Sequence, residues 1–490
     1  MAITAGDNLN SVATSTQMTL VNNYIDFTAS GTAGWAQQYL PDLMEKEAEV
    51  FGNRTVSGFL AQVGAEEAMS SDQVIWSEQG RLHLSYNGTL DVSANQITIG
   101  TDLDGNAGGA AHGIRVGDTI IVSSSRDGAT TQCYVKTRTA GAATIVALPY
   151  KAALMSDAAA GTLSDGTCKV FVYGSEFAKG TAGQTSSNEP VHKSFTNKPI
   201  ILKDFYQING SDASQIGWVE ISGEDGQNGY LWYLKAEGDT RARFSDYVEM
   251  SMVESVKALA ASTIHDDAVY GGGSASTVIA NTDPGTEGLF AAIEDRGNMT
   301  SGVTGVNAAT DLAEFDAILA EFDKQGAIEE NMMFVNRATA LAMDDMLASM
   351  NSYGAGGTSY GVFDNSEDMA LNLGFSGFRR GSYDFYKTDW KYLNDNATRA
   401  GVVESSSAIR GVMIPAGVSS VYDQSLGKNL KRPFLHVRYR KGQTEDRKMK
   451  TWITGSVGGN VTTDVDSMNV HYLSERCLVV QGANNFMLMN

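Results

Sequence analysis

The sequence predicts an α+β chain of several domains, with a small β-barrel or sandwich inserted into a larger body that carries one long helix. Three observations support this. Short β-rich segments separated by Gly and Asp turns recur between residues 88 and 174. One apolar face continues from Gly229 to Ile264. Helices and strands alternate after residue 288. A length of 490 residues allows two to four domains, and a hydrophobic content of 42% is enough for packed cores.

The N-terminal region, residues 1–55, is predicted to be an extended arm. Its first 40 residues are small, polar and weakly periodic, so they need a partner to order them. Pro41 suits the first turn of a short helix, which Gly52 would end.

Two extended stretches flank the predicted insert. Residues 72–86 alternate between apolar and polar side chains, as a half-exposed strand does. The stretch 197–207 is expected to return beside it, which predicts an extended loop made of residues 56–87 and 175–207. A two-stranded loop buries little surface by itself, so its apolar side chains are expected to need cover from another copy of the chain. These side chains are Trp76, Leu82, Leu84, Ile200, Ile201 and Leu202.

The insert itself, residues 88–174, contains five short β-rich runs that are joined by Gly and Asp turns. This spacing is typical of a small barrel or a sandwich, and the sequence leaves both open. A polar Gly/Ser/Thr linker, residues 175–194, leads out of it.

The long helix is predicted over residues 229–264, within a region that spans 208–287. Phe244, Val248 and Met252 recur every four residues, and Val256 continues the pattern. A helix of about 35 residues would be roughly 50 Å long at 1.5 Å per residue.

An α/β region is predicted over residues 288–425. It contains a helix that starts near Thr310 and stops at Gly326, a strand at 331–336 and a helix at 337–350. The remaining residues, 426–490, alternate strands and turns, and we expect them to return to the sheets of the earlier regions.

Motifs for catalysis or metal binding are weak in this sequence. The patterns G-x-x-x-x-G-K-[ST], G-x-S-x-G and H-E-x-x-H do not occur. His265–Asp267 is better explained as a solvated helix end than as a metal site. Asp102–Asn106 resembles half of a calcium loop, but Ala107 and Gly113 stand where that loop needs glycine and glutamate. A hairpin turn is therefore favoured, and neither an enzyme nor a metal or cofactor is predicted.

The composition bears on partners and compartment. A net charge of −21 argues against a protein whose main task is to grip nucleic acid. The three cysteines form no CxxC pair, which favours free thiols over a Cys133–Cys168 disulfide and fits synthesis in the cytosol. No apolar run approaches the ~20 residues of a membrane helix, and the first residues do not resemble a secretory signal.

One segment departs from the acidic average. Between Lys428 and Lys450 there are nine bases and two acids. This basic strip could face a nucleic acid, or it could pair with the acidic surface of a neighbouring copy, and we favour the second. Arg438 and Arg440 are two residues apart on a predicted strand and therefore share a face. The candidate subunit-contact residues are Trp76, Arg81, Arg432, Arg438, Arg440, Lys441 and Lys448.

Four phrases of the sequence resemble those of large phage capsid proteins. They are VIWSEQGRL (Val74–Leu82), KPIILKDFYQING (Lys198–Gly210), YDFYKTDWKYLND (Tyr383–Asp395) and HYLSERCLVVQGANNF (His471–Phe486). The order of the predicted parts is similar to the Hong Kong 97-type capsid fold of tailed bacteriophages, over most of the chain. The resemblance maps the N-terminal arm to 1–55, the peripheral domain with its spine helix to 208–287 and the axial domain to 288–425. Residues 426–490 would supply return strands to both domains.

The resemblance implies a major capsid protein in an enlarged form, because the β domain at 88–174 is not part of the minimal fold. It implies self-assembly into hexamers and pentamers of an icosahedral head that encloses double-stranded DNA. The implied partners are portal, scaffold and decoration proteins, with no membrane. The implied location is the virion, after synthesis in the bacterial cytoplasm. The alternative is another virion protein, such as a tail or adhesin protein; an enzyme is a third, less favoured possibility.

Overall fold

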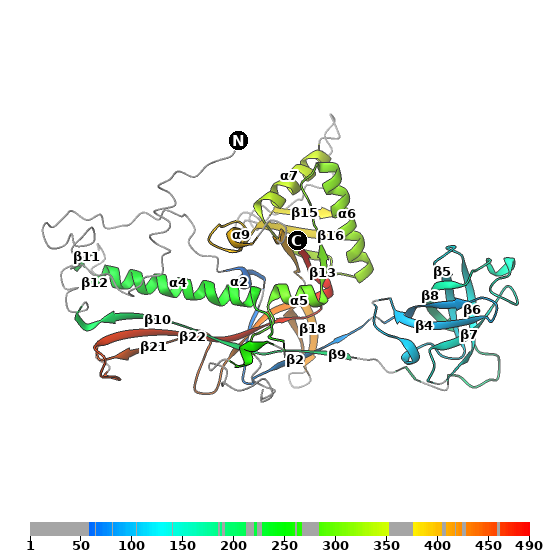
Figure 1. Ribbon diagram of the computed structural model, residues 1–490, viewed down its shortest axis with the longest axis horizontal. Helices are drawn as coiled ribbons and strands as arrows, with labels where there is room; N and C mark the ends of the chain where they lie inside the picture. Colours follow the sequence, from blue (N-terminus) through cyan, green and yellow to red (C-terminus); the bar gives the residue numbers. More distant parts are fainter. Residues whose placement is uncertain are drawn as a thin grey trace. The chain divides into compact units, whose positions relative to one another are not determined.

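The computed structural model describes residues 58–63, 65–80, 82–103, 105–139, 141–184, 187–188, 192–211, 220–222, 228–259, 262–266, 284–351, 376–403, 408–416, 418–423, 428–457 and 461–490. The chain divides into two compact units (Figure 1). Unit 1 contains Met1–Trp76 and Thr196–Asn490, and unit 2 contains Ser77–Phe195. The arm expected at 1–55, with its short helix, lies outside the described residues.

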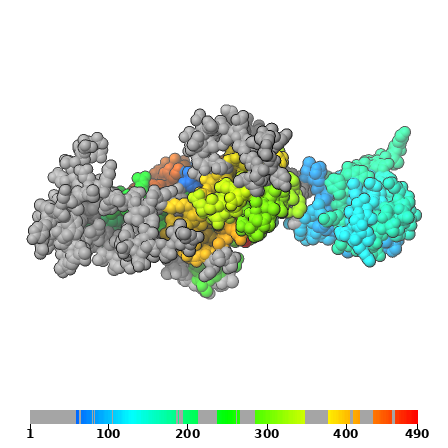
Figure 2. Space-filling view, turned by 90° about the horizontal axis from the view of Figure 1, so that it is seen from above, coloured from blue at the N-terminus to red at the C-terminus, as the bar shows by residue number. Residues whose placement is uncertain are grey.

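Unit 2 is a closed six-stranded barrel with the order β3-β4-β7-β6-β5-β8, and it forms one rounded body in the space-filling view (Figure 2). The strands are β3 (Ser85–Asp91), β4 (Gln96–Asp102), β5 (Asp118–Ser124), β6 (Thr130–Arg138), β7 (Thr144–Pro149) and β8 (Gly166–Ser175). Two short 3-10 helices, η2 (Gly109–Ala111) and η3 (Ala158–Ala160), lie in its loops.

The alternation of side chains explains why these strands close into a barrel. Along β6, Thr131, Cys133 and Val135 point inward and are buried, whereas the residues between them are partly or fully exposed. Of the two architectures that the sequence left open, the structure has the barrel. The sequence pattern placed the start of the unit at residue 88 and so divided β3 between the loop and the insert.

The first sheet of unit 1 has the order β1-β20-β22-β10, with β21 also paired to β22. Its strands are β1 (Ala65–Met69), β10 (Ile200–Asn209), β20 (Leu435–Arg440), β21 (Lys450–Gly455) and β22 (Ser467–Val480). Helix α4 (Leu231–Glu254) runs along β10 and β22 (Figure 1). Its Phe244 and Val248 pack on Val470 and Tyr472 of β22, which buries this part of the sheet face.

The long helix is shorter than predicted, because α4 ends at Glu254 and not near Ile264. The backbone N–H of Gly288 donates to the carbonyl oxygen of Ser255 at 2.7 Å, and that of Ala258 donates to Pro284 at 3.0 Å. A crossing segment therefore takes up backbone groups that would continue the helix. The apolar repeat beyond this point was misleading, since Val256 is 66% exposed.

The predicted pairing of the stretch 197–207 with residues 72–86 is wrong. β2 (Val74–Gln79) pairs with β9 (His192–Asn197), whereas β10 pairs antiparallel with β22. Asn197 explains the change of partner, because its buried side-chain amide donates to the carbonyl oxygens of Leu478 and Glu287. The chain is thus tied to the first sheet just before β10 begins.

The second sheet of unit 1 has the order β13-β23-β17-β14-β16-β15. Its strands are β13 (Asn298–Thr300), β14 (Glu330–Val335), β15 (Ser376–Arg380), β16 (Tyr383–Asp389), β17 (Gly411–Pro415) and β23 (Met487–Met489). Helices α5 (Leu289–Arg296), α6 (Ala308–Gln325) and α7 (Arg337–Asn351) accompany it, and α6 and α7 contact each other (Figure 1). The strand and two helices predicted between Thr310 and residue 350 are confirmed within two residues.

Short elements complete unit 1. Two two-stranded ribbons are formed by β11 with β12 and by β18 with β19. The bounds of these and the remaining elements are α2 (Phe59–Val63), β11 (Glu220–Ser222), β12 (Asn228–Tyr230), η5 (Thr263–Asp266), η8 (Lys391–Leu393), α9 (Arg399–Val402), β18 (Val418–Asp423), β19 (Lys428–Pro433) and η10 (Ala483–Asn485).

Candidate assembly interface

The face of the first sheet opposite α4 carries a row of three aromatic rings. Phe205 on β10 and Trp452 on β21 are both register partners of His471 on β22. The ring centroids of Phe205 and His471 are 6.0 Å apart, and those of Trp452 and His471 are 5.1 Å apart with planes 16° from parallel. Since Tyr472 points to α4, its neighbour His471 points to the other side. We call this row the aromatic row.

The aromatic row is partly open to solvent. Phe205 is 45% exposed, and Ile201, which lies four residues earlier on the same side of β10, is 52% exposed. His471 is held by the hydroxyl of Thr454, 2.7 Å from its Nε2 atom, and partial burial lowers the pKa of its ring. A neutral, stacked imidazole therefore belongs to the apolar surface and does not act as a free cation near neutral pH.

Three bases of the predicted strip are paired with acids from the start of the described chain. Arg438 on β20 forms an ion pair with Glu67 on β1, with 2.8 Å between nitrogen and oxygen. Lys448 pairs with Glu66, and Arg440 pairs with Asp72. Strand β1 lies parallel to β20, and this places the acidic side chains against the basic ones.

Glu66 also accepts a contact from a base outside the strip. Its carboxylate lies 3.3 Å from the guanidinium of Arg476, whose side chain is 9% exposed. Burial lowers the pKa of Arg476, and the carboxylates of Glu66 and Glu249 oppose that change. Glu249 itself accepts the backbone N–H groups of Gly58 and Leu60 at 2.6 and 2.9 Å, so the start of α2 is attached to α4.

The remaining bases with described ion pairs are also matched within the chain. Their ion pairs are Lys441–Asp446 at 3.3 Å, Arg447–Glu475 at 2.8 Å and Lys450–Glu445 at 2.6 Å. The six bases of the strip whose side chains are described are thus each paired with a carboxylate of the same chain. The sequence pattern missed this compensation, because Asp72 and Arg440 are 368 residues apart. The role of the strip in subunit contacts stays a prediction.

The other candidate contact residues have different surroundings. Trp76 is buried within unit 1, beneath the guanidinium of Arg296 at 5.9 Å, so the expectation that its ring needs cover from another copy is wrong. Arg81 lies outside the described residues, and Arg432 lies on β19 but its side chain is not described. Leu82, by contrast, is 86% exposed, and its cover by another copy stays a prediction.

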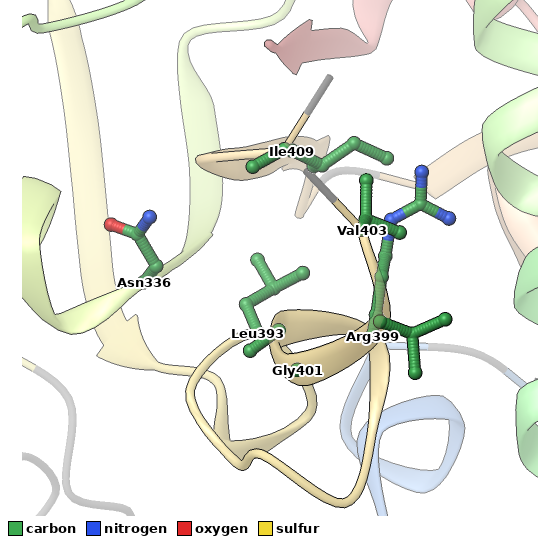
Figure 3. A pocket seen from close by; sticks show the side chains of 9 residues that line it. Asn336, Leu393, Arg399, Gly401, Val403 and Ile409 are labelled. Carbon is green, nitrogen blue, oxygen red and sulfur yellow. The ribbon is translucent and has the colours of Figure 1, made fainter. Parts of the chain in front are cut away.

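A cavity of about 490 Å³ lies beside α9 (Figure 3). Its lining is mainly aliphatic, with Leu393, Val403 and Ile409 on its walls and Asn336 and Arg399 as polar members. The guanidinium of Arg399 is already engaged by Glu254 at 2.5 Å and lies 5.2 Å from the ring of Phe290. No carboxylate, histidine or cysteine is among the lining side chains of this part of the structure.

Metal-binding and membrane features were also sought in the described ranges. They contain no group of three or more His, Cys, Asp or Glu side chains placed to hold a metal ion. The carboxylate of Asp102 accepts the backbone and side-chain N–H groups of Asn106 at 2.7 and 2.9 Å, which is the bonding of a closed turn. No helix in this part of the chain is long and apolar enough to span a bilayer.

No protein-family model matches the chain, and no curated protein matches it. Solved structures do match over most of its length. A structure from Microbacterium phage Oxtober96 is 9% identical with a TM-score of 0.37, and the match covers 95% of this chain and 99% of that one. The capsid of cyanophage P-SCSP1u is 9% identical with a TM-score of 0.37, and the match covers 95% and 96% of the two chains. The mature capsid of bacteriophage PhiM1 is 7% identical with a TM-score of 0.36, and the match covers 94% and 95%. The chain is therefore similar, remotely, to phage structures that include capsids.

Proposed function

We propose that this chain is the major capsid subunit of a tailed bacteriophage and that it builds a shell from copies of itself. The aromatic row carries the proposal. One face of a long sheet is covered by α4, while the other presents Phe205, His471 and Trp452 in one line. Large exposed apolar patches on soluble proteins often mark interaction sites, and the aromatic row is the candidate for such a patch here.

The finer proposal is a Hong Kong 97-type subunit that forms hexamers and pentamers of an icosahedral head around double-stranded DNA. The order of parts supports it: a two-stranded connection, an inserted barrel, a helix along a long sheet and an α/β sheet with its own helices. When one subunit surface binds a different surface of the next copy, repetition generates a closed assembly if the rotation between copies closes. Portal, scaffold and decoration proteins are the proposed partners, and the bacterial cytoplasm is the proposed place of synthesis.

The paired bases bear on how the subunit would meet its neighbours and its DNA. Compensation within the chain leaves the described side chains of the strip, residues 433–450, with little net charge to offer to phosphates. With a net charge of −21 for the whole chain, broad attraction to DNA is not expected. We therefore propose that copies meet mainly through apolar surface, with charged groups setting orientation.

The test is electron microscopy and sedimentation of the purified full chain, compared with the variant Phe205→Asp. The wild type is expected to form closed particles. The variant is expected to remain folded by circular dichroism but to sediment as small species, because a carboxylate in the aromatic row would be buried without a partner. Phe177→Asp is the matched control, since Phe177 is 41% exposed, is of the same residue type and lies in unit 2.

Two outcomes would overturn the proposal. One is a wild-type chain that stays monomeric at high concentration under every assembly condition. The other is a Phe205→Asp variant that assembles as well as the wild type, which would show that the aromatic row is not an interface.

A tail or adhesin protein is the second candidate. The outer wall of the barrel supports it, because Phe171 and Tyr173 on β8 are 39% and 48% exposed and Tyr150 is 49% exposed. Exposed aromatic side chains are common at recognition surfaces. Antibody labelling of purified virions separates the two candidates, since a capsid subunit would be labelled over the head and an adhesin only on the tail.

A further inference from the structure

The two strands that connect unit 1 with unit 2 are both fixed at their unit 1 ends. β2 leaves unit 1 at Trp76, and β9 re-enters it at Thr196. These strands pair with each other (Figure 1). Both strands are fixed on residues of one short segment, 286–296, which therefore links the two attachments.

The attachment of β2 is made by an aromatic ring and a guanidinium. Trp76 is 7% exposed, and the guanidinium carbon of Arg296 lies 5.9 Å from its ring centroid. Arg296 in turn donates to both carboxylate oxygens of Glu287, at 2.7 and 3.0 Å. These two parallel hydrogen bonds fix the plane of the guanidinium. The guanidinium is thereby held near the ring of Trp76, where a cation–π contact stabilises it.

The attachment of β9 is made by hydrogen bonds to a buried amide. Asn197 is fully buried, and its Nδ2 atom donates to the carbonyl oxygens of Leu478 and Glu287 at 2.6 and 3.0 Å. Its Oδ1 atom accepts the backbone N–H of Glu287 at 2.9 Å and the hydroxyl of Thr286 at 3.0 Å. The preceding carbonyl oxygen, that of Thr196, accepts a hydrogen bond from the Nζ atom of Lys257.

Glu287 joins the two attachments. Its carboxylate holds the guanidinium that covers Trp76, and its backbone holds the amide of Asn197. The side chains of Glu287 and Arg296 are only 11% and 10% exposed. Breaking a contact among such buried groups leaves a charge or an amide without its partner, which is costly.

We propose that Trp76, Asn197, Glu287 and Arg296 form a clamp that fixes the root of the two-stranded connection on unit 1. While the clamp is closed, bending of the connection is confined to the strand residues beyond it, 77–79 and 192–195. Release of β2 requires the Arg296–Glu287 pair to open, and β9 then loses its hydrogen bonds to β2 while Asn197 stays bound. The clamp does not depend on the proposed shell function, because every contact in it lies within one chain.

The test is hydrogen–deuterium exchange of the full-length chain, wild type against Arg296→Lys. Lysine keeps the charge but loses the two-bonded fork and the flat group over Trp76. Exchange in β2 and β9 is expected to rise about tenfold, the effect of losing one charge-assisted contact. Exchange in the barrel strands β4 to β7 and in α6 is expected to stay as in the wild type.

Arg380→Lys is the matched control. Arg380 also donates to both carboxylate oxygens of one acid, Asp316, at 2.5 and 2.7 Å. It lies on β15 in unit 1, outside the clamp and outside segment 286–296, so its replacement is expected to leave exchange in β2 and β9 unchanged. An equal rise in the two lysine variants would mean general loosening of unit 1 and would overturn the proposal.

Glu287→Gln provides a second variant in case Arg296→Lys does not fold. Glutamine keeps the backbone contacts to Asn197 and removes only the carboxylate. It is expected to produce the same rise in both strands, and the double variant is expected to add little, because both changes open one contact. The proposal fails if either folded variant exchanges at the wild-type rate in β2 and β9.

Discussion

Glu67 and Arg438 are register partners on the parallel strands β1 and β20, and their side chains form an ion pair of 2.8 Å. The pairing brings an early segment of the described chain onto an edge of a sheet whose other strands come from later in the sequence. Glu66 and Asp72 extend the same relationship to Lys448 and Arg440. β1 is therefore held by matched charge as well as by backbone hydrogen bonds.

We expect a measurable coupling between Glu67 and Arg438. Their side chains are 27% and 17% exposed, so solvent screens the pair incompletely. A double-mutant cycle with Glu67→Gln and Arg438→Gln should give a coupling of about 1 kcal/mol in the free energy of unfolding, measured by urea denaturation. The exposed pair Lys324–Glu321 is the control and should give about 0.3 kcal/mol. Equal couplings for the two pairs would contradict this view of β1.

We expect acid to weaken the barrel through His112. Its ring is 2% exposed, neither ring nitrogen has a hydrogen-bond partner in the described chain, and burial together with nearby Arg138 lowers its pKa to about 4. The unfolded chain binds the proton near pH 6.5, so stability present above that pH is lost as the pH falls toward 4. The full loss would be about 3 kcal/mol, at 1.36 kcal/mol per pKa unit.

The measurement is hydrogen exchange of the barrel strands at pH values from 7 to 4, corrected for intrinsic exchange. His112→Phe keeps a ring in the site and removes the titrating group, so its barrel should lose less stability over this interval. Parallel pH profiles of the variant and the wild type would assign the acid sensitivity to other groups.

We expect the cysteines to be inert in the folded chain. Cys133, Cys168 and Cys477 are buried and unpaired, and burial raises the pKa of Cys133 to about 12 and that of Cys168 to about 11. A three-unit rise reduces the thiolate fraction roughly a thousandfold, and thiolate is the reactive form. Iodoacetamide followed by mass spectrometry should modify none of them natively and all three in denaturant. Rapid native labelling of Cys133 would mean that the barrel opens.

We expect two glycine replacements in the region of α4 to have opposite effects. A Cβ atom on Gly288 would lie 2.8 Å from the carbonyl oxygens of Ser255 and Val253, so Gly288→Ala should lower the free energy of unfolding by about 2 kcal/mol. A Cβ atom on Gly238, within α4, would meet nothing within 4 Å. Gly238→Ala should therefore raise the free energy of unfolding by about 0.7 kcal/mol. Thermal unfolding measures both, and destabilisation by Gly238→Ala would contradict the open surroundings.

Elements with local signals were predictable from the sequence. The start of α6 is marked by Asn307, whose side chain accepts the backbone N–H of Thr310, and its end by Gly326 in the left-handed region at φ +65°. The barrel was predictable as a β unit because inward residues such as Ile97 and Ile99 alternate with polar ones between Gly and Asp turns. In these cases the residues that decide the structure are neighbours in the chain.

Pairings between distant segments were not predictable. The sequence does not show that β10 joins β22 rather than the stretch at 72–86, since this depends on the buried amide of Asn197. The end of α4 depends on Gly288, a residue of another segment whose backbone N–H donates to the carbonyl oxygen of Ser255. The same limit applies to the candidate site. The bases of the strip could be recognised in the sequence, but their ion pairs with Glu66 and Glu67 could not, because these acids are distant in the chain.

The position of β23 in the second sheet has a consequence for folding during synthesis. Met487–Met489 lies between β13 and β17, so this sheet is incomplete until residues 487–489 have left the ribosome. The barrel is built from one continuous stretch, Ser85–Ser175, and all its strands are available long before that. Contacts between distant residues form slowly, and exposed strand edges aggregate. In the nascent chain the barrel can therefore fold while the second sheet is still incomplete. We expect chaperones to bind unit 1 rather than the barrel during synthesis.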